Sequence, residues 1–293
     1  MYPLIKIFKR EIPTYAIMAL IGIFVSGIYA TRAINKKKKD DNEVIFMLLI
    51  ATIGVFIGGH LLYGIVNFGE IINIFKNIKQ YSGFISFAKD LLVLFSGQVF
   101  YGGLIGGIIA GLIYAKKKKL DSDYYDIMAP TIPLFHSFAR IGCFLGGCCY
   151  GIPSKFGFTY HNAIVESANN ISRFPVQLLE AFLNFILFLV LSKFFKKEKF
   201  KSNLMYIYLY SYAVIRFLLE FLRGDTYRGK FWIFSTSQLI SILIIVIVTI
   251  ILLIKNKKSK KIIATVNWQT NQKKQKPHEI GVLKYKKNKK EKK

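Results

Sequence analysis

Long apolar blocks separated by clusters of lysine constrain this 293-residue chain more than any other feature. Seven blocks reach the roughly 20 residues that an α-helix needs to cross a bilayer. Hydrophobic residues make up 53% of the chain and charged residues 20%, and the two kinds are segregated along the sequence, which excludes a soluble globular enzyme. We therefore predict an all-α polytopic membrane protein with seven transmembrane helices, over 13–33, 44–66, 90–115, 126–148, 176–195, 203–222 and 234–254.

The lysine clusters predict the orientation of the chain. Basic residues concentrate in three alternate loops, around 32–39, 116–119 and 193–201. By the positive-inside rule these loops face the cytoplasm, which places the N-terminus outside and the C-terminus in the cytoplasm. The first block is too long for a signal peptide and no small-residue cleavage site precedes a polar mature chain, so we expect it to stay in the protein.

The composition changes after residue 254. We expect a transmembrane domain over 1–254 and a basic cytoplasmic tail over 255–293, whose scarcity of apolar residues predicts disorder. Adhesion of this tail to anionic lipid is the alternative. A formal net charge of +26 also suits nucleic-acid binding, but lysines that flank membrane-spanning blocks are explained by orientation, so no nucleic-acid partner is expected.

One arginine interrupts the fourth block. A charge at the bilayer midplane costs about 2.5–3.5 kcal/mol on insertion scales, so Arg140, in FARIGCFLGGCCYG, marks a candidate site. The glycines of this segment allow close approach of either a lipid headgroup or another helix. The alternative for Arg140 is a structural ion pair with Glu180 or Glu220.

The sixth block ends in a second charged group. Arg216, Glu220 and Arg223 fall at i, i+4 and i+7, which predicts that they share one face of a helix. A planar guanidinium binds two phosphate oxygens at once and keeps its charge, so this face suits a phosphate ester, with Glu220 orienting an arginine. The alternative for Arg223 is a position at the interface beside Asp225.

The three cysteines, Cys143, Cys148 and Cys149, do not predict a metal site. They form no paired CxxC motif and no Cys/His set. Buried thiols usually act as small hydrophobic groups. We therefore expect no metal and no cofactor.

Five motifs resemble those of one family. FARIGCFLGGCCYG resembles the signature segment of the prolipoprotein diacylglyceryl transferases, GGHLLY their GGRxGY element and YGGLIGG their HGGLxG motif. FPVQLLEA resembles their HPSQLYEA segment and RFLLEFLR their RxxxExxR motif. The motifs cover nearly all of 13–254 in the family's order. Departures from the family indicate a divergent member; they are Tyr101 for His, His60 for Arg, Cys143 for Asn and Phe174 for His.

The resemblance implies a transferase of the bacterial cytoplasmic membrane that acts with no cofactor. Its substrates would be phosphatidylglycerol, which donates the diacylglyceryl group, and a prolipoprotein, whose lipobox cysteine thiol accepts it as glycerol phosphate leaves. Arg140 and Arg216 are expected to bind the phosphate and Glu220 to orient Arg216. Tyr15 and Tyr101 would donate hydrogen bonds or help in proton transfer. The remaining candidate substrate-binding residues are Gly102, Gly103, Gln177, Glu180 and Arg223.

Two other functions remain open from the residues alone. One is a related lipid-phosphate transferase with another acceptor. The other is a non-catalytic lipid-binding or transport protein. A transporter typically has discontinuous helices in matching positions of two halves, and no such symmetry is evident in the sequence.

Overall fold

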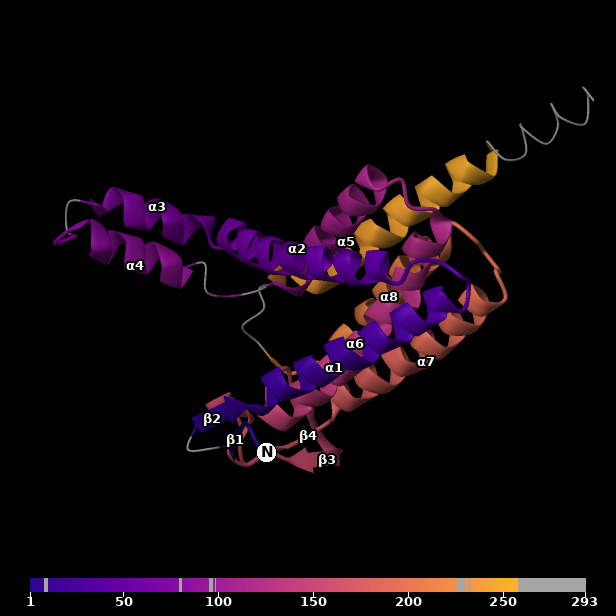
Figure 1. The fold of residues 1–293 in the computed structure, drawn as a ribbon. Helices are drawn as coiled ribbons and strands as arrows, with labels where there is room; N and C mark the ends of the chain where they lie inside the picture. Colours follow the sequence, from indigo (N-terminus) through magenta and orange to yellow (C-terminus); the bar gives the residue numbers. More distant parts are fainter. Residues whose placement is uncertain are drawn as a thin grey trace, which may run out of the picture.

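A computed structural model describes residues 1–7, 10–78, 81–94, 97, 99–225, 230–231 and 233–257. The predicted tail over 255–293 therefore lies outside the described residues from 258 onward. Helices dominate the described part of the chain (Figure 1). They are α1 (Thr14–Asn35), α2 (Asn42–Val66), α3 (Phe68–Lys76), α4 (Phe84–Leu94), α5 (Phe100–Lys117), α6 (Ser122–Gly146), α7 (Val176–Lys196), α8 (Leu204–Leu219) and a last helix over Thr236–Lys257, with 3₁₀ turns η2 (Glu166–Ala168) and η3 (Glu220–Leu222).

Short strands occupy segments between the helices, which the all-α prediction did not include. They form three antiparallel pairs: β1 (Leu4–Ile7) with β2 (Arg10–Pro13), β3 (Pro153–Thr159) with β4 (Ser172–Arg173), and β5 (Lys230–Phe231) with β6 (Phe234–Ser235). The β3–β4 pair lies within the segment over 147–175 that links α6 to α7. Strands β1 to β4 gather at one end of the helices and form no layer of their own (Figure 1).

Five helices in the described part of the chain are long and apolar enough to cross a membrane: α1, α2, α7, Leu204–Leu222 and Thr236–Lys257. Large apolar side chains on these helices face outward, such as Phe24, Leu49 and Phe182. The chain is therefore a multi-pass membrane protein. Helices α5 and α6 occupy the third and fourth predicted spans. Helix α6 is continuous, but Asp123, Asp126 and Arg140 interrupt its apolar sequence.

The third predicted span begins in the wrong place. Instead of one helix from residue 90, α4 ends at Leu94 and α5 begins at Phe100. Two residues just before α5 form backbone hydrogen-bond contacts with α2. Val99 N–H donates to the Gly59 carbonyl (3.2 Å), and the Gly97 carbonyl oxygen lies 2.9 Å from His60 Nδ1. Helix α4 instead pairs with α3 in a hairpin that extends away from the bundle (Figure 1).

Glycines bring α2 and α5 into close contact. A Cβ added to Gly58 would lie 2.3 Å from the Gly102 carbonyl oxygen, and one added to Gly106 would lie 2.3 Å from the Gly54 oxygen. Both distances are far shorter than van der Waals contact, so only glycine fits. The small-residue spacing in YGGLIGG therefore serves helix packing, and this packing holds Tyr101 at the start of α5.

The basic loops meet at one end of the bundle. Lys37 Nζ lies 2.9 Å from both Asp123 Oδ1 and Glu198 Oε1, and Lys39 also pairs with Asp123. Burial alone would raise the pKa of Asp123, but hydrogen bonds from Lys39 and Lys37 outweigh it and lower the pKa to about 2. These ion pairs join the loop after α1 to the first turn of α6 and to the loop after α7.

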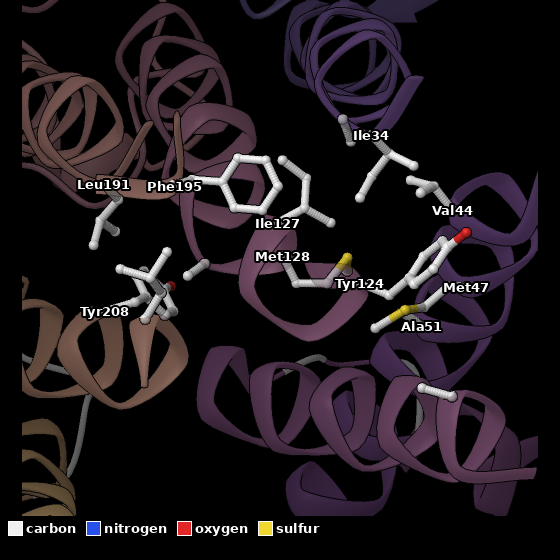
Figure 2. Packing of buried hydrophobic residues seen from close by; sticks show 14 of the residues in the cluster. Ile34, Val44, Met47, Ala51, Tyr124, Ile127, Met128, Leu191, Phe195 and Tyr208 are labelled. Carbon is white, nitrogen blue, oxygen red and sulfur yellow. The ribbon is translucent and has the colours of Figure 1, made fainter. Parts of the chain in front are cut away.

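An apolar core lies beneath these loops. Figure 2 shows Ile34 of α1, Val44 of α2, Ile127 of α6, Leu191 of α7 and Tyr208 of α8 packed in this region. All five side chains are fully buried. Because lipid tails are as apolar as these side chains, close van der Waals packing rather than transfer out of water holds the helices together here. The core therefore fixes the relative positions of the helices that carry the charged site.

Candidate functional site

Glu180 of α7 lies at the centre of a buried charged cluster. Its Oε2 is 3.0 Å from Arg140 Nε of α6 and 3.6 Å from Arg216 Nη1 of α8. The side chains of Arg140, Glu180 and Arg216 are 8%, 1% and 2% exposed. The structure thus brings together the two arginines predicted to share a site, and it also contains the Arg140–Glu180 ion pair that the sequence left as an alternative.

Residues one helical turn before each arginine complete the cluster. Arg140 Nε lies 3.1 Å from His136 Nε2, and Tyr212 donates to Glu180 Oε1 at 3.5 Å. Because an arginine N–H can only donate, His136 Nε2 must accept, which makes this imidazole neutral. The i, i+4 spacing of His136 with Arg140, and of Tyr212 with Arg216, aims both pairs at α7.

Glu220 pairs with Arg216 as predicted, with 2.7 Å between Arg216 Nη2 and Glu220 Oε2. The prediction that Arg223 continues the same helical face is wrong. Helix α8 ends at Leu219, η3 follows, and Arg223 has extended backbone angles. Arg223 instead forms two hydrogen bonds with Asp225, at 2.9 and 2.7 Å.

Two guanidinium nitrogens in this region are buried without a hydrogen-bond acceptor among the described residues. They are Nη1 of Arg216 and Nη1 of Arg223. Leaving a buried polar group without a hydrogen bond costs about 1–3 kcal/mol, and more when the group is charged. Each of these nitrogens could donate a hydrogen bond to an oxygen of an anionic ligand.

Two serines of the last helix, Ser237 and Ser241, connect Tyr101 to Arg216. The Tyr101 hydroxyl lies 2.7 Å from Ser241 Oγ, and Ser241 Oγ donates to the Ser237 carbonyl at 2.8 Å. Ser237 Oγ in turn accepts from Arg216 Nη2 at 3.4 Å. Tyr101 is therefore tied to the arginine cluster through the last helix.

Tyr15 of α1 packs against α6 close to Arg140. A Cβ on Gly142 of α6 would be 3.2 Å from the Tyr15 backbone, so this glycine allows α1 to pack closely. The Tyr15 hydroxyl is near enough to Arg140 and Cys143 to interact with them electrostatically, and the residue is 45% exposed.

Three other predicted residues have packing or structural contacts. Gly102 and Gly103 face α2, against Gly58 and Val55. Gln177 is 1% exposed, donates to the Cys148 carbonyl at 2.8 Å and accepts from Tyr160 at 3.2 Å. These contacts place the three residues in the scaffold around the arginines.

Sequence reasoning missed several members of the cluster. Tyr212, Ser237 and Ser241 were not identified as site residues. The available signal was polar residues repeating at i, i+4 within apolar helices, as in Tyr212 with Arg216 and Ser237 with Ser241. The sequence also did not predict how close the cysteines lie: the sulfur atoms of Cys143, Cys148 and Cys149 all lie within 4.8 Å of one another.

Comparisons with known proteins agree with this architecture. Residues 3–254 match the family described as prolipoprotein diacylglyceryl transferase. The phosphatidylglycerol–prolipoprotein diacylglyceryl transferase of Clostridium tetani (strain Massachusetts / E88) is 34% identical over 242 residues, which is 82% of this chain and 91% of the relative. Phosphatidylglycerol–prolipoprotein diacylglyceryl transferase 2 of Clostridium perfringens (strain 13 / Type A) is 30% identical, over 82% of this chain and 89% of the relative.

A protein from a third organism is also similar. The phosphatidylglycerol–prolipoprotein diacylglyceryl transferase of Campylobacter hominis is 31% identical over 82% of this chain and 85% of the relative. The family match spans the helices that carry Arg140, Glu180 and Arg216. The chain therefore belongs to the prolipoprotein diacylglyceryl transferase family.

Proposed function

We propose that this chain transfers the diacylglyceryl group of phosphatidylglycerol to the thiol of the lipobox cysteine of a prolipoprotein. The observation that carries this proposal is the pair of buried arginines on either side of Glu180. A lipid phosphate is the anion that such a site, surrounded by apolar helices, is suited to bind. The names of the relatives support the same donor and the same class of acceptor.

In this reaction the acceptor sulfur attacks the glycerol carbon that carries the phosphate. A carbon–sulfur bond forms, the carbon–oxygen bond to phosphate breaks, and glycerol phosphate leaves with the bonding electrons. Arg140 and Arg216 stabilise the charge on the leaving phosphate. Because Glu180 and Glu220 already hold these guanidinium groups in place, little reorganisation is needed when the phosphate becomes more negative.

The remaining site residues have supporting roles. Arg223 supplies a further buried donor, Nη1, toward the same anion. Tyr101, which bonds to Ser241, and Tyr15, which interacts electrostatically with Arg140, would each donate a hydrogen bond to the headgroup or relay a proton. Gln177, Gly102 and Gly103 maintain the packing that positions these groups.

The membrane arrangement is also part of the proposal. Helices α5 and α6 complete seven spans in the bacterial cytoplasmic membrane, with the N-terminus outside and the C-terminus in the cytoplasm. The ion pairs among the three basic loops support a common cytoplasmic side for them. Residues 1–254 then form the catalytic domain and 255–293 a cytoplasmic tail.

The purified protein in vesicles tests this function directly. A lipobox peptide is added to vesicles of phosphatidylglycerol, and mass spectrometry measures the thioether product together with released glycerol phosphate. We expect both products with the cysteine peptide and neither with a peptide in which serine replaces that cysteine. Vesicles of phosphatidylcholine are the matched lipid control.

Two outcomes would contradict the proposal. Consumption of phosphatidylglycerol at the same rate without peptide would indicate a lipid-phosphate transferase with another acceptor. Lipid binding with no modification of the cysteine peptide would indicate a non-catalytic lipid-binding protein.

A further inference from the structure

A sharp turn after α6 brings the three cysteines of the chain together. Gly147 has a left-handed backbone (φ 73°), Gly147 N–H donates to the Phe144 carbonyl, and Cys148 N–H donates to the Cys143 carbonyl, both at 3.1 Å. This pair of bonds is a Schellman motif, which reverses the chain at a helix end. Cys148 is thereby folded back onto Cys143, five residues earlier.

The third cysteine joins them through an unusual backbone conformation. Cys149 has φ 58°, a region that non-glycine residues seldom occupy and that costs about 1–2 kcal/mol. All three sulfur atoms lie within 4.8 Å of one another, with Cys143 buried and the other two half-buried. Gln177 fixes the turn from α7 by its hydrogen bond to the Cys148 carbonyl.

The dimensions of this cluster suit a thiophilic metal ion. With zinc–sulfur bonds of about 2.3 Å in tetrahedral geometry, bound sulfurs lie about 3.8 Å apart. The sulfurs here need to approach by no more than about 1 Å, which side-chain rotation can supply. Thiolate ligands favour zinc and copper(I) over the hard cations that prefer oxygen.

The cluster also lies beside the proposed reaction centre. Arg140 Nη1 is 4.0 Å from Cys143 Sγ, so the residue that we propose to bind the phosphate also contacts the thiol group. The guanidinium would balance part of the negative charge of three thiolates. Three protein ligands leave the fourth position of a tetrahedral zinc open, as in catalytic zinc sites.

We propose that Cys143, Cys148 and Cys149 bind one Zn²⁺ ion whose fourth position takes the acceptor thiol of the substrate peptide. This inference rests on the proposed function. A thiol that coordinates zinc loses its proton, here to water, and becomes the thiolate that the reaction needs. The thiolate then forms the carbon–sulfur bond as the phosphate leaves, and the neutral thioether, a weaker ligand, dissociates. The zinc does not change oxidation state.

Metal binding is tested first, with the full chain in detergent. The protein is stripped with a chelator and titrated with Zn²⁺ against a chromophoric competitor, and bound metal is counted by mass spectrometry. We expect one Zn²⁺ per chain, at least a tenfold loss of affinity in Cys148→Ser and Cys149→Ser, and no binding in the triple Cys→Ser variant. His161→Ala is the control, because His161 is an exposed imidazole outside the cluster. The Zn²⁺ affinity of this variant should equal that of the wild type.

Coordination of the acceptor thiol is tested next, by substituting Co²⁺ for zinc and recording its visible spectrum. The lipobox peptide should change the thiolate-to-cobalt bands, whereas the peptide with serine in place of cysteine should not. Absence of stoichiometric zinc, or binding that survives in the triple variant, would overturn the metal site. Zinc binding with a spectrum unaffected by the cysteine peptide would overturn the role of the fourth position.

Failure of this inference can be distinguished from failure of the proposed function. Metal-free protein that transfers the diacylglyceryl group at the rate of the zinc-loaded protein overturns the inference and leaves the function intact. Protein that binds zinc and shifts its cobalt spectrum with the cysteine peptide, yet transfers nothing, supports the site and overturns the function.

Discussion

Replacing Glu180 by Gln should destabilise the protein strongly. The side chain keeps its shape, but Arg140 and Arg216 lose the carboxylate that lies 3.0 and 3.6 Å from them in a region closed to water. Removing one partner of a buried ion pair typically costs about 3–5 kcal/mol, because the remaining charge stays buried and uncompensated. At about 2–4 °C per kcal/mol for chains of 150–250 residues, the melting temperature should fall by roughly 6–20 °C.

The matched control is Glu11→Gln, which removes a carboxylate that is 54% exposed and lies 3.6 Å from Lys6. Exposed pairs contribute at most about 1 kcal/mol, so this variant should melt almost like the wild type. Melting is followed by far-ultraviolet circular dichroism of the helices in detergent, with and without phosphatidylglycerol. The lipid should restore part of the stability of Glu180→Gln, because a bound phosphate replaces the missing carboxylate. Equal melting of the two variants would refute the central position of Glu180.

Three further predictions concern separate parts of the chain. Gly106→Ala should lower the free energy of unfolding by about 1–3 kcal/mol, because the new Cβ would lie 2.3 Å from the Gly54 oxygen. Gly27→Ala, whose Cβ would have no atom within 4 Å, should leave it unchanged, and equal melting temperatures of the two variants would contradict the packing of α2 against α5. Tyr101→Phe should lower kcat for diacylglyceryl transfer at least about tenfold, whereas Tyr29→Phe, which also breaks a Tyr–Ser hydrogen bond, should keep the wild-type kcat. A wild-type kcat for Tyr101→Phe would show that Tyr101 takes no part in the reaction. The pKa of Asp123, about 2 in the folded protein and about 3.9 when unfolded, predicts a stabilisation that is present above pH 4 and lost between about pH 4 and 2. Asp123→Asn should lack this component when melting temperatures are compared across that range, and identical pH profiles would contradict the role of the lysine pairs.

The parts of the fold that depend on local sequence were predictable. Apolar blocks and lysine clusters indicate helices and loops, because burial in lipid requires long apolar segments and cytoplasmic loops retain basic residues. The break before α5 was missed because it depends on contacts between Gly97, Val99 and α2, which no local pattern encodes. The departure of Arg223 from the helical face of Arg216 and Glu220 was missed for a similar reason, since Arg223 turns to meet Asp225.

The site was predictable in its charged residues but not in its partners. An arginine inside an apolar block is conspicuous, so Arg140 and Arg216 could be identified from the sequence alone. That both would share Glu180 depends on how α6, α7 and α8 pack together. The cysteine cluster was missed because the spacing Cys-x₄-Cys-Cys matches no common metal motif, and only the left-handed turn at Gly147 brings the sulfur atoms together.

The most direct test of the account is the rate of thioether formation in phosphatidylglycerol vesicles when Arg140 and Arg216 are replaced singly and together. Each alanine variant should lose at least about 100-fold in kcat/KM, and Arg140→Lys should lose activity while keeping the positive charge. The double variant should lose less than the product of the single losses, because both arginines hold one phosphate. The exposed Arg10→Ala should retain the wild-type rate. A folded Arg140→Ala protein with near-normal kcat/KM would contradict the proposed role of the buried arginines.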